Sequence, residues 1–267
     1  MQNIHETAII HEGAKLHPSV KVGAYSIIYP DVTIDEGTVV GEHCVISGIT
    51  SIGKNNIFYR CCSIGGQPQD KKYNNEPTEL RIGNNNMFRE FVTVNTGTVQ
   101  DLGYTQVGDY NWIMAYTHIA HDCVVGNQTV IANSVQMAGH VHIDDWAIIG
   151  GNSSVHQFCH IGKHCMVGGM SGVRQSIPPY VIGSGFPFKP RGVNLEGIRR
   201  RGFTPEQMSV VKEGYKLIYL RKLGIDEALT ELKQALSQKQ DTDQAAILQD
   251  YIDFFTINPD HRGLSRS

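Results

Sequence analysis

The chain has 267 residues, and its 23 lysines and arginines against 26 aspartates and glutamates give a formal net charge of -3. This near balance argues against non-specific binding of the whole protein to nucleic acid or to a membrane surface. With 18% charged and 40% hydrophobic residues, the composition excludes a disordered chain. No apolar run approaches the roughly 18 residues of a membrane span, and the first residues do not resemble a signal peptide. We therefore expect a cytoplasmic protein with no membrane span.

An apolar residue recurs at every sixth position over most of residues 1–190. Neither a 3.6-residue helix nor simple strand alternation has this period. The period is typical of a three-sided coil of parallel strands, in which each six-residue unit forms one side and three units close one coil. About eight coils are expected, or about 40 Å of prism. The repeating apolar positions are Ile10, Leu16, Val22, Ile28, Ile34, Val40, Ile46, Ile52, Phe58, Ile64, Ile82, Phe88, Val94, Val107, Ile113, Ile119, Val125, Ile131, Met137, Ile143, Ile149, Val155, Ile161, Val167 and Val173.

The composition changes near residue 190. Leucine is rare before this point and common after it. We therefore predict a mainly β protein with two domains: a parallel β-helix, shaped as a triangular prism of hexapeptide repeats, over residues 1–190, and a small all-α domain over residues 191–267. Five cysteines occupy the small inward position of a unit and are predicted to be core residues. They are Cys44, Cys62, Cys123, Cys159 and Cys165.

Two segments interrupt the repeat, and both are predicted to loop out from the prism. Residues 66–79 are polar, with prolines near both ends, and residues 95–106 form a shorter interruption. Loops held on a rigid scaffold often carry binding residues.

Histidines are concentrated in residues 118–164. Positions 18 apart begin the same side of the prism on successive coils, so the repeat predicts four histidines along one edge. They are His118, His121, His140 and His156. Asp122 directly follows the second of them, and Gly139 directly precedes the third. A single histidine at a corner is usually a solvated side chain, whereas four on one edge predict a functional site. Imidazole there serves either as a general base or as a zinc ligand, so two mechanisms stay open.

The last part of the chain carries helix signals. Thr204 is placed as an N-cap, Pro205 as the first helical residue and Gln207 as the partner in a capping box. Asp226 and Asp243 begin two further helical patterns. These signals predict the helices of the C-terminal domain.

Seven short segments have a distinctive order of polar residues and glycines. They are Gln69-Asp70-Lys71-Lys72-Tyr73, His118-Ile-Ala-His-Asp-Cys123, Ala138-Gly-His140, Ile149-Gly-Gly151, Val155-His-Gln-Phe-Cys159, Gly192-Val-Asn-Leu-Glu-Gly197 and Arg200-Arg-Gly-Phe203. Together they resemble the UDP-N-acetylglucosamine O-acyltransferases of lipid A biosynthesis, from about residue 3 through the helical tail. The resemblance implies that the β-helix is left-handed, against the usual right-handed crossover.

The resemblance also implies a reaction. The family transfers a (3R)-hydroxyacyl chain from acyl carrier protein to the 3-hydroxyl of UDP-GlcNAc, the first step of lipid A biosynthesis. No metal or other cofactor is expected, because the acyl donor is carried on the phosphopantetheine of the carrier protein. His121 matches the family's general base, Asp122 the residue that orients it, and Gly139 the backbone donor to the oxyanion.

Further positions match the family's substrate-binding residues. They are Gln69, Asp70, Lys72, His118, His140, His156, Gln157, Asn194, Glu196, Arg200 and Arg201. Gly169 matches a position that acts as a ruler at the end of the acyl groove, and glycine there implies a longer chain. The Gly185-Phe186-Pro187 connector departs from relatives that carry Asn-His, so no nucleotide contact is carried over to it. Family members are homotrimers with a site between two subunits, so we expect a homotrimer.

Two rival interpretations use the same prism. Carbonic anhydrases of the γ class bind zinc through histidines from two subunits, but they lack the segments at 69–72 and 200–203. A non-catalytic solenoid scaffold would need no column of histidines. The acyl length, and the choice between a 3-hydroxyl and a 3-amino acceptor, stay open.

Overall fold

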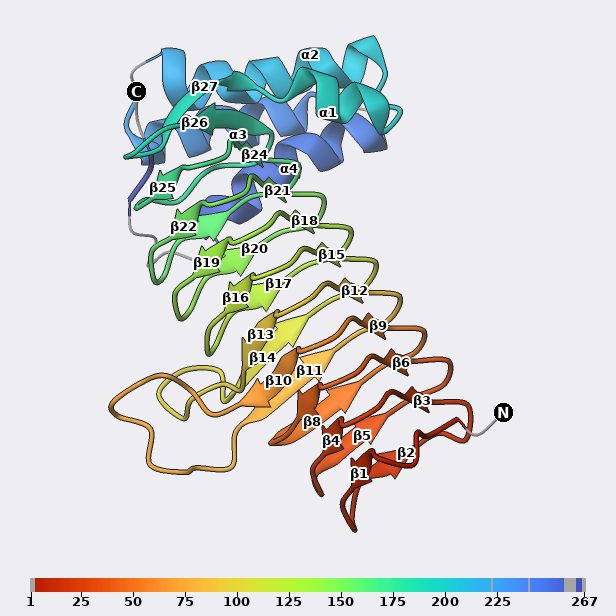
Figure 1. The fold of residues 1–267 in the computed structure, drawn as a ribbon. Coiled ribbons are helices and arrows are strands. Elements are labelled where there is room, and N and C mark those ends of the chain that lie inside the picture. The colour runs from red at the N-terminus through yellow and green to blue at the C-terminus, as the bar shows by residue number, and fades with distance from the viewer. Residues whose placement is uncertain (1–2, 222, 240, 257–262, 266–267) are drawn as a thin grey trace.

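The structure, a computed structural model, describes residues 3–221, 223–239, 241–256 and 263–265. Figure 1 shows a triangular prism of short parallel strands, with helices covering its C-terminal end and two loops projecting from one side. Among the described residues, no helix combines the length and the apolar character that a membrane span requires.

Three sheets form the sides of the prism, and we number them in the order in which the chain enters them. Sheet 1 contains β1 (Ile9–Ile10), β4 (Ile27–Ile28), β7 (Val45–Ile46), β10 (Ser63–Gly66), β13 (Thr93–Asn95), β16 (His118–Ile119), β19 (Gln136–Met137), β22 (Ser154–Val155) and β25 (Gly172–Val173). Sheet 2 contains β2 (Lys15–Leu16), β5 (Val32–Ile34), β8 (Ile49–Ile52), β11 (Glu79–Ile82), β14 (Tyr104–Val107), β17 (Val124–Val125), β20 (His142–Ile143) and β23 (His160–Ile161). Sheet 3 contains β3 (Lys21–Val22), β6 (Val39–Val40), β9 (Ile57–Phe58), β12 (Met87–Phe88), β15 (Trp112–Ile113), β18 (Val130–Ile131), β21 (Ile148–Ile149), β24 (Met166–Val167), β26 (Val181–Ser184) and β27 (Lys189–Val193).

The register of the strands follows the 18-residue coil. In sheet 1, Gln136 pairs with His118 on one side and with Ser154 on the other. The repeating apolar residues point inward; Ile119 and Met137, for example, are at most 1% exposed. The five cysteines predicted to be core residues are buried, which confirms that prediction.

Four-residue corners join the sheets, and we name each edge of the prism by the sheets that it joins. Edge 1–2 includes corners 120–123, 138–141 and 156–159, edge 2–3 includes corners 144–147 and 162–165, and edge 3–1 includes corners 150–153 and 168–171. The third residue of most corners has a positive φ, a conformation that turns the backbone sharply from one side of the prism to the next. On edge 1–2 these residues are Asp122 (56°), His140 (61°) and Phe158 (64°). Successive coils therefore align corresponding side chains along each edge.

Both predicted loops leave the prism at edge 1–2. The first joins β10 to β11 and the second joins β13 to β14, so each connects sheet 1 to sheet 2. Their bases touch, because the hydroxyls of Thr78 and Thr96 lie 3.3 Å apart.

The helical tail follows the antiparallel pair of β26 and β27. It consists of α1 (Leu195–Arg200), α2 (Pro205–Tyr215), a π-helical turn η1 (Lys216–Leu220), α3 (Ile225–Ser237) and α4 (Thr242–Thr256). The predicted capping box is confirmed, since Thr204 accepts from the Gln207 backbone N–H and the Gln207 side chain accepts in return. Asp250 on α4 ties the tail to the prism by accepting from Lys163 Nζ at 2.5 Å. The domain boundary at residue 190 stays a prediction; this position lies within β27.

Candidate active site

A histidine–aspartate pair occupies edge 1–2. The Asp122 carboxylate accepts a hydrogen bond from the Nδ1–H of His121 at 2.8 Å, and the Asp122 side chain is fully buried. Thr98 donates its backbone N–H to one carboxylate oxygen at 2.9 Å and its hydroxyl to the other at 2.6 Å. Burial by itself would raise the pKa of Asp122, but the hydrogen bonds from His121 and Thr98 outweigh it and the pKa is lowered. Asp122 is therefore ionised at neutral pH, and it leaves Nε2 of His121 as the free base atom.

Gly139, which belongs to the next coil, lies against the ring of His121. A Cβ atom added to Gly139 would lie 2.5 Å from Cε1 and 2.6 Å from Nε2 of His121. Real nonbonded carbon atoms stay about 3.5–4.0 Å apart. Only glycine allows the imidazole and the backbone of residue 139 to come this close.

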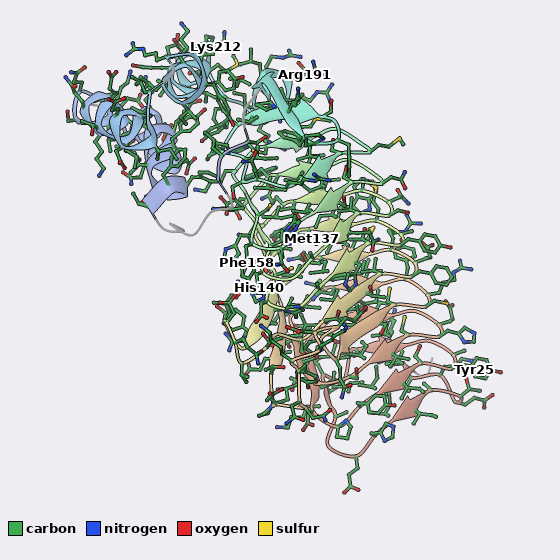
Figure 2. All side chains as sticks on the ribbon, turned by 90° about the vertical axis from the view of Figure 1, so that its left-hand side faces the viewer. Tyr25, Met137, His140, Phe158, Arg191 and Lys212 are labelled. Carbon is green, nitrogen blue, oxygen red and sulfur yellow. The ribbon has the colours of Figure 1, made fainter. Side chains whose placement is uncertain are left out.

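His140 is the next side chain along the edge. Its Nδ1 lies 2.6 Å from a carboxylate oxygen of Asp101, on the second loop. Its ring stacks on Phe158 with centroids 4.3 Å apart and meets the His121 ring edge-on at 5.0 Å. Figure 2 shows His140 and Phe158 together on the prism, below the helical tail. These contacts hold the two imidazoles at right angles.

His118 lies on strand β16 and not at a corner, with its ring on the outer side of sheet 1. Thr93 contacts its Nδ1 at 2.7 Å. Burial lowers the pKa of His118, with a smaller contribution from His121. His118 is therefore neutral at pH 7.

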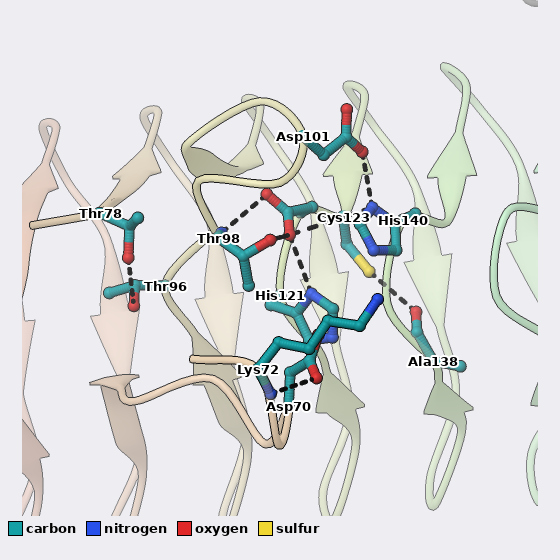
Figure 3. A network of polar contacts seen from close by, with 11 residues as sticks. Asp70, Lys72, Thr78, Thr96, Thr98, Asp101, His121, Cys123, Ala138 and His140 are labelled. Atoms are coloured by element: carbon teal, nitrogen blue, oxygen red, sulfur yellow. Dashed lines mark hydrogen bonds and ion pairs between the residues drawn. The ribbon is translucent and has the colours of Figure 1, made fainter. Parts of the chain in front are cut away.

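A cleft of about 740 Å³ opens over sheet 2, between the two loops and α4, and reaches edge 1–2 at His140. Asp70 and Lys72 from the first loop line it together with Asp101 and His140. Figure 3 shows the two loops on either side of His121. The Lys72 backbone N–H donates to the Asp70 carboxylate at 3.0 Å, which fixes the tip of the first loop. The structure thus brings both loop residues to the edge that carries His140.

The remaining predicted residues of this edge are exposed. Gln69 lies on the first loop, and His156 and Gln157 lie on the corner one coil beyond His140. The His156 ring Nδ1 lies 3.2 Å from the Gln157 carbonyl oxygen.

Two family descriptions match the chain. "Udp N-acetylglucosamine O-acyltransferase; Domain 2" matches residues 177–265, and "Bacterial transferase hexapeptide (six repeats)" matches residues 13–48 and 104–139. A protein of Herminiimonas arsenicoxydans named acyl-[acyl-carrier-protein]--UDP-N-acetylglucosamine O-acyltransferase is 48% identical over 100% of both chains. A protein of the same name from Verminephrobacter eiseniae is 52% identical over 89% of this chain and 92% of its own. The chain belongs to the UDP-N-acetylglucosamine O-acyltransferase family.

Solved structures agree with this assignment. The UDP-N-acetylglucosamine acyltransferase of Francisella novicida superposes with a TM-score of 0.92 at 38% identity, covering 99% of this chain and 94% of its own. The UDP-N-acetylglucosamine O-acyltransferase of Moraxella catarrhalis has the same TM-score at 42% identity, covering 99% and 100%. These matches confirm the predicted fold, a left-handed parallel β-helix followed by a small helical region, and the prediction of an acyltransferase. Neither rival interpretation finds support among them.

The tail residues of this acyltransferase lie on a different edge of the prism. Arg201 donates to the Trp146 carbonyl at 2.8 Å and to His164 Nδ1 at 2.9 Å, and both partners belong to corners of edge 2–3. Asn194 is buried as the N-cap of α1 and donates to the His164 carbonyl oxygen. Glu196 accepts from exposed Arg200 at 2.8 Å. Within one chain, these four predicted substrate-binding residues are not brought to the His121 edge.

Gly169 lies on the third edge. It is exposed in corner 168–171 of edge 3–1, on the opposite side of sheet 1 from His121. It is also about three strand spacings, or about 14 Å, further along the prism axis. Gly169, the predicted acyl-chain ruler, and the histidines of one chain are therefore separated by a full side of the prism.

Among the described residues, one group has ligand atoms close enough together to hold a metal ion. It consists of His121, Asp122 and His140, whose ligand atoms lie within 4.8 Å of one another. Both oxygens of the Asp122 carboxylate already accept hydrogen bonds from Thr98. The Nδ1–H of His121 is a third donor to this carboxylate. About three of its four acceptor positions are therefore in use, and the arrangement fits a base held by an acid better than a metal site.

Three side chains at the site were not predicted. Thr98 and Asp101 lie on the loop that interrupts the repeat, so no periodicity locates them. Phe158 lies 18 positions after His140, and the repeat could have located it.

Proposed function

We propose that this acyltransferase moves a (3R)-hydroxyacyl chain from acyl carrier protein to the 3-hydroxyl of UDP-GlcNAc, the first step of lipid A biosynthesis. The observation that carries the proposal is the pairing of His121 with buried Asp122, directly against Gly139. The names of relatives that match over the full chain support the same substrates. We expect the reaction in the cytoplasm, with the acyl group delivered on phosphopantetheine and no metal step.

The pair accounts for the proton transfers. The 3-hydroxyl oxygen bonds to the thioester carbonyl carbon while Nε2 of His121 takes the hydroxyl proton. Ionised Asp122 stabilises the imidazolium that forms. The backbone N–H of Gly139 stabilises the oxyanion of the tetrahedral intermediate. When the C–S bond breaks, the imidazolium gives its proton to the leaving pantetheine sulfur, so the base is regenerated.

The side chains around the pair suit the acceptor. Asp70, His118 and His140 offer hydrogen-bonding groups for the sugar, and Lys72 offers a positive charge for the diphosphate. Gln69, His156 and Gln157 border the same edge and are assigned to substrate binding with them. The guanidinium groups of Arg200 and Arg201 suit phosphate binding, with Asn194 and Glu196 beside them.

A trimer of a particular arrangement would complete the site. If edges 3–1 of three copies meet at a threefold axis, the outer face of sheet 3 of one copy faces sheet 1 of the next. Edge 2–3 of one copy, with Arg200, then lies beside edge 1–2 of its neighbour, with His121. Gly169 lies near the axis, at the inner end of a groove that begins at His121.

Exposed apolar side chains support this arrangement. Trp112 (46% exposed) and Ile57 (38%) lie on the outer face of sheet 3. Tyr116 (57%) and Met170 (76%) project from edge 3–1. Large apolar side chains exposed in a continuous region commonly mark a protein interface.

Complementation tests the shared site. The variants His121→Ala and Arg200→Ala are purified separately, and both are expected to have low activity in a carrier-protein thiol-release assay. In mixed trimers formed from both variants, about one site in three combines intact His121 from one copy with intact Arg200 from another. Recovery of about a third of wild-type activity is expected. Mixed trimers without recovery would contradict the shared site, and a wild-type enzyme that releases no thiol with UDP-GlcNAc would contradict the proposed reaction.

A further inference from the structure

The loop between β13 and β14 holds both histidine–carboxylate pairs of the site. Thr98 donates hydrogen bonds to both carboxylate oxygens of Asp122, and a carboxylate oxygen of Asp101 lies 2.6 Å from His140 Nδ1. The base of the loop is fixed, because Thr98 is buried and its carbonyl accepts from the Gly103 N–H at 3.0 Å. Figure 3 shows Thr98 at the carboxylate that holds His121, and Asp101 at the imidazole of His140, both from this one loop. The loop is therefore part of the site and does more than cover it.

His140 is constrained on every side that the structure describes. Phe158 covers one ring face at 4.3 Å, and the ring of His121 meets it at right angles. The backbone of His140 has a φ of 61° and donates its N–H to the His121 carbonyl at 3.0 Å. The Asp122 carboxylate lies 3.9 Å from Nδ1, too far for a hydrogen bond. Asp101 is therefore the carboxylate that determines how the His140 ring is rotated about its last torsion.

We propose that Asp101 is a positioning residue: it holds the proton of His140 on Nδ1 and so presents Nε2 to the acceptor sugar. The proposal rests on the assignment of His140 to acceptor binding made above. A carboxylate accepts only, so the ring nitrogen that faces it must carry hydrogen. The partner of one ring nitrogen thereby determines the role of the other. Without Asp101 the ring could rotate by 180° and exchange its two nitrogens.

Kinetics of matched variants test this role. Asp101→Ala is expected to raise the KM for UDP-GlcNAc about 10-fold, the lower end of what one lost charge-assisted hydrogen bond brings. The kcat is expected to change much less, because His121 and Asp122 keep their own contacts. Asp101→Asn keeps an oxygen acceptor in the same place and should restore most of the affinity. Val99→Ala, an exposed position on the same loop, is the control and should leave both constants unchanged.

A double-mutant cycle separates positioning from simple loop stability. If Asp101 acts through His140, adding Asp101→Ala to His140→Gln should raise KM no further. Independent effects that multiply in the double variant would overturn the proposal. So would a fall in kcat with unchanged KM.

Nitrogen NMR of histidine-labelled enzyme gives a readout that needs no turnover. His140 is assigned by comparison with His140→Gln, and its Nδ1 is expected to carry hydrogen in the wild type and to lose this preference in Asp101→Ala. A wild-type ring with hydrogen only on Nε2 would overturn the proposal, whatever the activity. Failure of acyl transfer itself would contradict the proposed function, and the NMR result would still decide the role of Asp101.

Discussion

The closeness of Gly139 to the His121 ring makes Gly139→Ala a sharp test of the site. The added Cβ would lie 2.5 Å from Cε1 of His121, against an ordinary carbon–carbon contact of about 3.5 Å. The backbone has no room to move, because the Ala138 N–H and the His140 N–H are both hydrogen-bonded within the prism. The imidazole must therefore shift by about 1 Å. That shift lengthens the 2.8 Å bond to Asp122 beyond hydrogen-bonding distance.

A displacement of this size has a large expected effect on rate. Misplacing a reacting group by about 1 Å can cost about 100-fold, and we expect kcat to fall by about this factor. Stability should fall by about 1–3 kcal/mol, because the buried Asp122 carboxylate loses one of its three hydrogen bonds. Gly139 does not have a left-handed backbone conformation, so alanine adds no backbone strain. The assay is thiol release from hydroxyacyl carrier protein with UDP-GlcNAc, alongside thermal unfolding.

Gly224→Ala is the matched control. A Cβ at Gly224 meets only a carboxylate oxygen of Glu227, at 3.8 Å, and the residue lies in the helical tail. This variant should keep full activity, with stability lowered by no more than about 1 kcal/mol because Gly224 is the N-cap of α3. A Gly139→Ala enzyme that folds normally and retains wild-type kcat would refute the placement of the base against this glycine.

Three further predictions concern the ruler, the subunit contact and pH. Gly169→Met fills the proposed inner end of the groove, and mass spectrometry of the products should show a shorter preferred acyl chain; an unchanged chain length would remove Gly169 from the groove. Trp112→Glu places a charge on the exposed outer face of sheet 3 and should yield monomers by light scattering, with loss of activity; an intact trimer would exclude this face from the contact. Burial, Arg201 and Lys163 lower the pKa of His164 to about 3, below the unfolded value of about 6.5. The unfolded chain therefore binds more protons below pH 6.5, and stability falls as the pH drops. Between pH 6.5 and pH 5 this group should cost about 2 kcal/mol, measured as the difference between urea unfolding of wild type and of His164→Phe; parallel pH curves for the two proteins would contradict it.

The sequence predicts those parts of the site that follow the repeat. His121 and Gly139 are separated by one coil, so the period alone brings them into contact. The same period places Gly169, the proposed ruler, at a different edge of the prism from His121. The five core cysteines follow from the same phase.

Features outside the repeat could not be placed in this way. Asp101 reaches His140 because its loop folds back over the edge, and no periodic pattern encodes that path. Arg201 is held on edge 2–3 by contacts with Trp146 and His164, which arise from packing of the tail on the prism. The sequence motif identified these residues only through resemblance, and it gave no reason to place them away from His121.

The most direct test of the account is the mass spectrum of the UDP-sugar after incubation with UDP-GlcNAc and a mixture of (3R)-hydroxyacyl carrier proteins. We predict one product, acylated on the 3-hydroxyl oxygen, whose formation falls by a factor of about 10² to 10⁴ in a normally folded His121→Ala enzyme. No acylated sugar from the wild type, or equal product from the variant, would contradict acyl transfer with His121 as the base.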